Sequence, residues 1–365
     1  DAAGNLLLRK GLAFERNEHL ESLIQNGVFV RVQEFKDYQT LLQETTGAPA
    51  PASASAAVSP PRVDPFRLRE TIGGSLLLLM RHPTQESDFV TKVRELAEQV
   101  QFLCENNPDA ALAAIMLSDH SKYAIAHSLD TAVLTELLGR KLDWSDAQRQ
   151  SAVCAALTMN IGMLDAQTIL ALQKMPPTEV QRAGIADHPR AGVALLGAAG
   201  VDDKNWLRIV QDHHEIPDGS GYPGGIKVAD QDTLLVRILD IFCAIVTPRA
   251  SRKASDTAQA ARALFVQENK YNNSLPGLLI KEIGLYPPGT FVKLKNGDTA
   301  VISKRATAST PILVHSFLNS SGIPMLEPMW RDTARAEFAI ASAIANDTIH
   351  TAVNFEKLWT AKTRT

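Results

Sequence analysis

The sequence predicts a mainly α-helical protein with a small α/β segment near its start and a small β appendage toward its end. Three observations support this fold class. Between residues 63 and 285, apolar residues recur at helical spacing almost throughout. Residues 47–55 are rich in Pro, Ala and Ser and contain no charged residue, so they cannot form a core. After residue 289 the apolar pattern changes to that of strands, which flank the turn-forming pair Asn296-Gly297.

These changes divide the chain into five predicted parts. In chain order they are a small N-terminal accessory domain (1–45), a flexible or semi-extended linker (46–62), a helical domain (63–285), a β-hairpin appendage (286–325) and a helical tail (326–365). An ordered loop is the alternative for the linker. Sensing, homodimer formation and shielding of an edge are open alternatives for the role of the accessory domain.

Local signals place the ends of several elements. In the accessory domain, Gly27 is a predicted C-cap between a helical stretch and the strand-like residues 28–32. In the helical domain, Ser145 begins a capping-box pattern that starts one helix, and Thr178 starts another. Pro189 is predicted at the first turn of the next helix.

The composition is that of an ordinary globular protein, with 45% hydrophobic and 21% charged residues. A net charge of −3 argues against a nucleic-acid partner and against a polybasic protein surface that binds membranes. The apolar run Leu76–Met80 is too short to cross a bilayer, so no membrane insertion is expected. Cys104, Cys154 and Cys243 lack metal-ligand spacing and are predicted to be buried free thiols, as is typical of a cytoplasmic protein. The start without methionine predicts that upstream residues have been trimmed.

Residues 213–223 hold the most informative motif, His-His-Glu-Ile-Pro-Asp-Gly-Ser-Gly-Tyr-Pro. Its imidazoles and carboxylates are typical metal ligands, and its glycines let the backbone approach a ligand closely. The motif is identical to HHExxDGxGYP, and the chain therefore resembles the HD-GYP family, within the HD superfamily of all-helical metal hydrolases. The resemblance covers most of 63–285. It implies an all-helical HD-superfamily bundle that hydrolyses cyclic di-GMP with two or three metal ions.

The resemblance also implies which residues bind metal. His127 stands where the family has an early helix histidine, His188 matches the histidine of HPxxG, and Asp240 matches the late aspartate. With the motif pair His213 and His214, these five residues follow the family order. For any one of them alone, a core or capping role is the alternative.

The centre of the implied site departs from the family pattern. Where the family has His-Asp-Ile-Gly-Lys, this chain has Met159-Asn160-Ile161-Gly162-Met163. Met159 replaces an imidazole with a thioether that binds hard metals poorly. Asn160 replaces the carboxylate that bridges the metals, and Met163 removes a lysine that would neutralise phosphate charge. Asp165 is the nearest substitute carboxylate in the sequence. No catalytic group of this motif is intact.

The remaining ligands predict either no metal or one divalent ion, such as iron, manganese or a zinc-like ion, held by His188, His213 and His214. A complete cluster of two or three metals is not expected. The glycine-tyrosine loop is intact, and it either lines a nucleotide pocket or serves folding alone. The resemblance implies that this loop docks GGDEF-domain proteins and that an arginine after the late helix contacts phosphate. The candidate residues are Glu215, Asp218, Gly219, Gly221, Tyr222, Pro223 and Arg249.

Three functions are compatible with this pattern. The favoured one is a degenerate HD-GYP signalling module that binds cyclic di-GMP or a partner protein with little or no hydrolysis. The runner-up is a metal-dependent cyclic di-GMP phosphodiesterase with a reduced metal site. The third is a structural or dimerising scaffold, in which changes at His213, His214 and Tyr222 would be tolerated.

Overall fold

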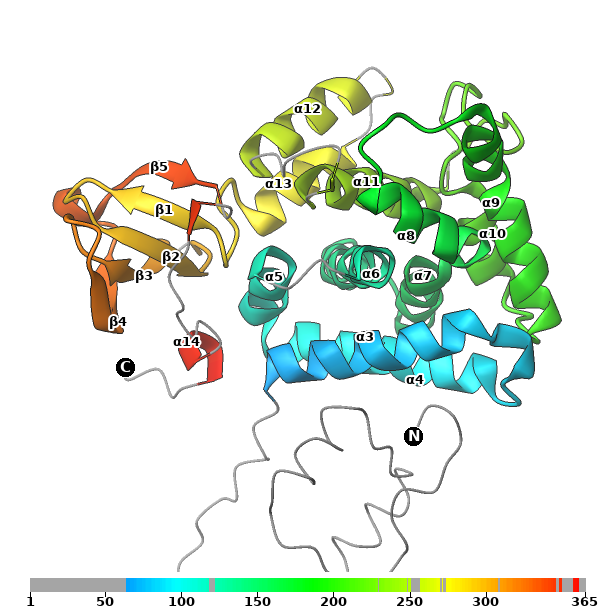
Figure 1. The fold of residues 1–365 in the computed structure, drawn as a ribbon, viewed down its shortest axis with the longest axis horizontal. Helices are drawn as coiled ribbons and strands as arrows, with labels where there is room; N and C mark the ends of the chain where they lie inside the picture. The colour runs from blue at the N-terminus through cyan, green and yellow to red at the C-terminus, as the bar shows by residue number, and fades with distance from the viewer. Residues whose placement is uncertain are drawn as a thin grey trace, which may run out of the picture. The chain divides into compact units, whose positions relative to one another are not determined.

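The structure is a computed structural model that describes residues 64–360 apart from 118–121, 229, 248, 251–256, 270, 272–273, 308, 346–347 and 350–356. These residues belong to one compact unit (Figure 1). The predicted accessory domain (1–45) and linker (46–62) lie outside the described residues, so both remain predictions.

A helical bundle forms most of the described chain, as the helical periodicity predicts. Its helices are α3 (Pro65–Arg81), α4 (Phe89–Asn106), α5 (Pro108–Leu117), α6 (Tyr123–Lys141), α7 (Asp146–Thr158), α8 (Leu164–Leu172), α9 (Glu179–Ala198), α10 (Lys204–Asp212), α11 (Gln231–Val246), α12 (Thr257–Asn269) and α13 (Leu275–Ile283), with short 3-10 turns η1 (Pro83–Gln85) and η2 (Ile161–Met163). The helix starts predicted at Ser145 and Thr178 are confirmed, whereas the start predicted at Pro189 is wrong, because Pro189 lies inside α9. The Ser145 hydroxyl accepts a hydrogen bond from the Gln148 N–H (3.3 Å), and Thr178 forms a reciprocal capping box with Gln181.

Helix α6 lies in the middle of the bundle (Figure 1). Every residue from Tyr123 to Gly139 is buried, because α3, α4, α7 and α11 pack around this helix. The neighbouring stretch Asp146–Leu172 is long and apolar enough to cross a membrane, with a mean hydropathy of 1.3. However, 61% of its most apolar window is buried within this fold, so the stretch serves as a core element here.

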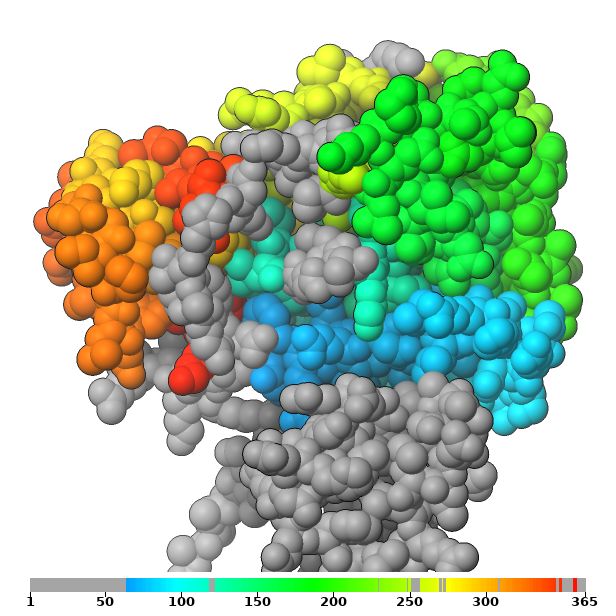
Figure 2. All heavy atoms as spheres, in the orientation of Figure 1, coloured from blue at the N-terminus to red at the C-terminus, as the bar shows by residue number. Residues whose placement is uncertain are grey.

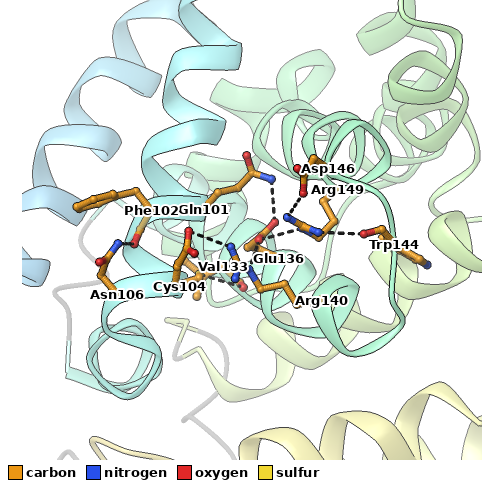
Figure 3. A network of polar contacts seen from close by, with 11 residues as sticks. Gln101, Phe102, Cys104, Asn106, Val133, Glu136, Arg140, Trp144, Asp146 and Arg149 are labelled. Carbon is orange, nitrogen blue, oxygen red and sulfur yellow. Dashed lines mark hydrogen bonds and ion pairs between the residues drawn. The ribbon is translucent and has the colours of Figure 1, made fainter.

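A buried carboxylate holds α6 in place through a charged network (Figure 3). Glu136 is fully buried, and one of its oxygens accepts hydrogen bonds from Arg140 Nε (2.7 Å) and Arg149 Nε (3.2 Å). Its other oxygen accepts from Gln101 Nε2 (3.0 Å). A buried charge is costly unless it is paired and hydrogen-bonded. The network therefore fixes α6 against α4 and α7, and α6 carries His127.

The β appendage is an antiparallel sheet of five strands in the order β4-β3-β2-β1-β5. The strands are β1 (Phe291–Leu294), β2 (Thr299–Lys304), β3 (Leu313–Leu318), β4 (Pro324–Asp332) and β5 (Ile340–Ile344). The predicted hairpin turn is confirmed, since Asn296-Gly297 lies between β1 and β2 and Gly297 has φ +88°. Arg305 joins the sheet to the bundle through ion pairs with Asp109 (2.7 Å) and Glu282 (2.8 Å).

The helical tail predicted for 326–365 is wrong over 326–344. Most of this stretch forms β4, the turn η3 (Ala336–Phe338) and β5. Within the described part of the tail, α-helix is confined to α14 (Lys357–Thr360). Residues 339–345 are rich in alanine, which favours helix when a segment is isolated. Pairing of β5 with β1 overrides that preference, because β1 supplies hydrogen-bond partners for the backbone of β5 along one edge.

Candidate metal and nucleotide site

The glycine-tyrosine loop is built around a buried glutamate. Glu215 is fully buried, and its Oε1 accepts hydrogen bonds from the backbone N–H groups of Gly224 (2.5 Å) and Gly225 (3.0 Å). Its Oε2 accepts from the Ile226 N–H (3.0 Å). The sequence analysis placed Glu215 among residues that would contact a nucleotide or partner. In the structure its carboxylate instead folds the loop back toward the two histidines that precede it.

Gly221 marks the tightest point of this loop. A Cβ atom added there would lie 2.5 Å from three backbone atoms, which belong to His214, Glu215 and Ile216. The next residue, Tyr222, donates its N–H to the His214 carbonyl (3.3 Å) and stacks its ring on the His214 imidazole, with ring centroids 4.6 Å apart. Burial raises the pKa of Tyr222 above its ordinary value. The GxGYP half of the motif is thus packed directly on the HHE half.

The other predicted loop residues shape or anchor the same turn. Gly219 has φ +83°, a conformation that glycine adopts without strain. Asp218 Oδ1 accepts a hydrogen bond from the Ser220 N–H (2.9 Å), and Asp218 Oδ2 accepts from the Tyr271 hydroxyl (2.9 Å). The Pro223 carbonyl accepts a hydrogen bond from Arg190 on α9. These contacts hold the loop in a defined shape beside α9.

Replacing Gly221 with alanine is expected to destabilise the protein by about 2–4 kcal/mol, because backbone atoms cannot move away as a flexible side chain could. Urea unfolding would measure the change. Gly184→Ala is a matched control on α9, where an added Cβ meets nothing within 4 Å, and it should be neutral or stabilising. Equal stability of the two variants would contradict the loop packing described above.

Three histidines, one from the middle of α9 and two from the end of α10, converge beside the loop. Donor atoms of His188, on α9, and of His213 and His214, after α10, all lie within 4.8 Å of one another. Among the described residues, this is the single group of three or more His, Cys, Asp or Glu side chains with donor atoms close enough to hold a metal ion. Helix α10 is held in place by Trp206, whose indole N–H donates to the Thr158 hydroxyl (2.8 Å) at the end of α7.

The ring orientation of two of these histidines suits a cation. His188 Nδ1 lies 2.6 Å from the Ile185 carbonyl, and His213 Nδ1 lies 2.8 Å from the Val210 carbonyl. A carbonyl oxygen only accepts, so both Nδ1 atoms carry the proton and both Nε2 atoms present lone pairs when the rings are neutral. These Nε2 atoms face each other at 3.3 Å. Two nitrogens bound to one tetrahedral zinc at about 2.0–2.1 Å lie roughly 3.3 Å apart.

Burial keeps these imidazoles neutral. It lowers the pKa of His188 to about 4, with a contribution from the neighbouring His213. Burial likewise lowers the pKa of His213 and holds that of His214 well below its ordinary value. Neutral imidazole is the form that binds metal. The three side chains therefore fit one divalent ion.

Asp240 and His127 form a separate pair next to this cluster. The His127 Nε2 to Asp240 Oδ1 distance is 2.6 Å, and both side chains are buried. Asp240 Oδ2 lies 3.9 Å from His214 Nδ1, so the carboxylate connects His127 to the cluster. Burial alone would raise the pKa of Asp240, but the hydrogen bond and charge of His127, together with His214 and His213, hold it below its ordinary value. The five predicted ligands thus come together as three histidines plus one His–Asp pair.

The positions where the sequence analysis found departures from the family pattern lie at a corner beside α9. Met159 is fully buried, and Asn160 is 1% exposed with neither amide atom hydrogen-bonded. The corner approaches α9 closely, because a Cβ added at Gly162 would lie 2.3 Å from the His188 carbonyl oxygen. This close approach requires glycine at position 162. Met163 is half-buried, and Asp165 is exposed in the first turn of α8.

Arg249 is engaged by a residue that the sequence analysis missed. Its Nε donates to the Tyr123 hydroxyl (2.8 Å), and its guanidinium lies 4.6 Å from the centroid of the Tyr123 ring. Tyr123 in turn stacks on His127, with ring centroids 5.5 Å apart and planes at 11°. Burial raises the pKa of Tyr123 to about 12. The sequence does indicate a contact between Tyr123 and His127, because residues four positions apart lie on the same face of a helix.

Known proteins resemble this chain in sequence and in fold. Residues 111–275 match the HD domain family. The fold resembles that of Bd1817, an HDG"Y"P protein from Bdellovibrio bacteriovorus, with a TM-score of 0.50 over 72% of this chain and 84% of that chain, at 19% identity. Residues 111–275 of this chain therefore carry an HD domain, and the structural neighbour supports a relation to the HD-GYP family. The mainly α fold with a C-terminal β appendage is therefore confirmed.

Relatives of this chain include named phosphodiesterases. Cyclic di-GMP phosphodiesterase PA4108 of Pseudomonas aeruginosa is 25% identical over 301 residues, which cover 77% of this chain and 71% of that protein. 3'3'-cGAMP-specific phosphodiesterase 3 of Vibrio cholerae is 33% identical over 158 residues, which cover 42% of this chain and 33% of that protein. Cyclic di-GMP phosphodiesterase PdeB of Borreliella burgdorferi is 23% identical over 185 residues, which cover 50% of this chain and 48% of that protein.

Proposed function

We propose that this chain is a cyclic di-GMP signalling module that binds the nucleotide at its histidine cluster and hydrolyses it slowly or not at all. The observation that carries the proposal is Asn160, which places a neutral amide at a buried position two residues before the contact of Gly162 with α9. The loop and the three histidines beside it keep their packing. The chain therefore has the loop and the histidines that would bind a nucleotide, but at position 160 it has no negative charge to hold a second metal ion.

The charge of the site supports a single divalent ion. Asp240 is the one carboxylate in contact with the described histidines of the site, and it is already paired with His127. Two divalent ions held close together repel each other unless an anion lies between them. The amide of Asn160 supplies no such charge. His188, His213 and His214 would hold one ion, which would polarise a phosphate oxygen and promote ionisation of water.

The residues of the chain itself would bind and orient the nucleotide. One face of the Tyr222 ring stacks on His214. The opposite face would be the one on which a base stacks. The loop also carries Ile226, which is 48% exposed. An exposed apolar side chain on this loop suits contact with a partner protein, and a GGDEF-domain protein is the partner that we propose.

A phosphodiesterase with a reduced metal site is the second candidate. It is favoured by the names of the relatives and by the intact histidine cluster. Its weakness is that, among the residues that the structure describes, the group able to hold a metal ion includes no carboxylate. Asp165, which the sequence analysis considered, is exposed on α8. A reduced site would also lack the lysine that Met163 replaces.

Equilibrium dialysis with labelled cyclic di-GMP would test the proposal, with 3'3'-cGAMP as competitor and manganese, iron or zinc added separately. Nucleotide products would be followed by chromatography in the same samples. We expect binding that is lost in the double variant His213→Ala, His214→Ala, with turnover far below the usual enzyme range of about 1–10³ per second. Turnover within that range would establish the phosphodiesterase. No binding in either protein would leave the scaffold function.

A further inference from the structure

A proline lies inside the helix that carries His188. Pro189 is buried within α9, which continues for nine residues beyond it to Ala198. Proline has no backbone N–H, so it cannot donate to the carbonyl four residues earlier, which belongs to Ile185. Its ring also pushes against that carbonyl and turns it out of the helical ladder. A buried interior proline costs helix stability, and this cost calls for a compensating role.

The carbonyl that Pro189 leaves without a ladder donor is the one that His188 uses. His188 Nδ1 donates to the Ile185 carbonyl at 2.6 Å, three residues back along α9. This hydrogen bond sets the tautomer, because it places the ring proton on Nδ1 and leaves the Nε2 lone pair for the cluster. His188 Nε2 then faces His213 Nε2 at 3.3 Å.

His213 shows the same device without a proline. Its Nδ1 donates to the Val210 carbonyl at 2.8 Å, again three residues back. Helix α10 ends at Asp212, and the last four carbonyls of a helix have no ladder donor. The Val210 carbonyl is therefore free because its helix stops. In α9 the helix continues past His188, so the equivalent carbonyl is free only because residue 189 lacks an N–H.

We propose that Pro189 is a positioning residue of the histidine cluster, which frees the Ile185 carbonyl to hold His188 with Nε2 directed at His213. The alternative is that Pro189 only fills space in the core. The proposal concerns the ring of His188 in the metal-free protein. It therefore stands or falls separately from nucleotide binding and hydrolysis.

The variants Pro189→Ala and Pro189→Leu separate the two roles. Both add the missing N–H, but alanine leaves a cavity at this buried position whereas leucine fills it. The added N–H competes with His188 for the Ile185 carbonyl. We therefore expect the same loss of the Nδ1–H tautomer at His188 in both variants. The affinity for zinc should fall about 10–100-fold, as is usual when an outer hydrogen bond of a metal-binding histidine is lost.

The tautomers can be read from two-bond proton–nitrogen correlations of ¹⁵N-histidine protein at pH 8 with chelator present, with His188 assigned by His188→Gln. His213 is the internal control, since its Val210 carbonyl is untouched. Zinc affinity would be measured by competition with a chromophoric chelator, and circular dichroism would check the fold. A shift at His188 but not at His213, in both variants, supports the proposal. An Nε2–H tautomer at His188 in the wild-type protein would overturn it, as would unchanged tautomer and zinc affinity in both variants.

Discussion

The triple variant Met159→His, Asn160→Asp, Met163→Lys is expected to bind about two divalent ions per chain, where the wild-type chain binds at most one. The reason is charge. The corner that carries Asn160 is buried against α9, and both amide atoms of Asn160 lack partners. A carboxylate at this position supplies the anion that two neighbouring cations need, and the new imidazole supplies another ligand. Elemental mass spectrometry of purified protein would give the stoichiometry.

Hydrolysis of cyclic di-GMP should rise with the second ion. Charge stabilisation by a metal ion is worth several kcal/mol, which corresponds to a rate increase on the order of 10²-fold or more. The same triple substitution combined with His213→Ala and His214→Ala is the control, and it should lose both the metal and the gain in rate. If the triple variant folds but binds no more metal than the wild-type protein, residues other than these three also prevent binding of a second ion.

Asn160→Asp alone separates folding from metal binding within that experiment. Without metal, a buried carboxylate that lacks a partner should lower stability. Added manganese should restore it, because ligand binding to the native state adds stability by mass action.

The helical core and the histidine cluster could be predicted because their signals are short in sequence. The caps at Ser145 and Thr178 depend on residues three positions away. The pair His213-His214 is adjacent, and the match to an 11-residue motif placed the loop beside it. Residues close together in the sequence are thus enough to identify these groups. The contact between His188 and His213 joins distant residues and could not be predicted in the same way.

The features that sequence reasoning missed depend on contacts between distant parts of the chain. Glu215 was expected to face a ligand, but its partners are backbone N–H groups 9–11 residues later, which no side-chain pattern reveals. The strands β4 and β5 form because β3 and β1 offer edges to them. Pro189 was placed at a helix start because that is its usual position. Its position inside α9 is explained by the hydrogen bond between His188 and the Ile185 carbonyl, which only the structure shows.

Acid is expected to destabilise the metal-free protein at a pH well above that at which its carboxylates protonate. The pKa of His188 falls from the ordinary value of 6.5 to about 4 on folding. Below pH 6.5 the His188 imidazole therefore binds a proton in the unfolded chain but stays neutral in the native protein. The free energy of unfolding falls as the pH is lowered, until the pH reaches about 4. A shift of this size corresponds to about 3 kcal/mol for His188. His213 and His214 act in the same direction, because their pKa values are also lowered.

Asp240 does not oppose this effect between pH 6.5 and pH 4. Its pKa is lowered, so its contribution to stability is complete above the ordinary carboxyl value of about 3.9 and is lost only as the pH falls further. Urea unfolding at several pH values with chelator present would measure the slope. His188→Gln should remove about one proton from it. The same imidazoles would bind the metal ion and are already neutral in the metal-free native protein, so saturating zinc should raise the free energy of unfolding but leave the slope above pH 6 unchanged. An equal slope in wild-type protein and His188→Gln would mean that His188 is not held neutral by burial, and the argument for a preformed cation site would fail with it.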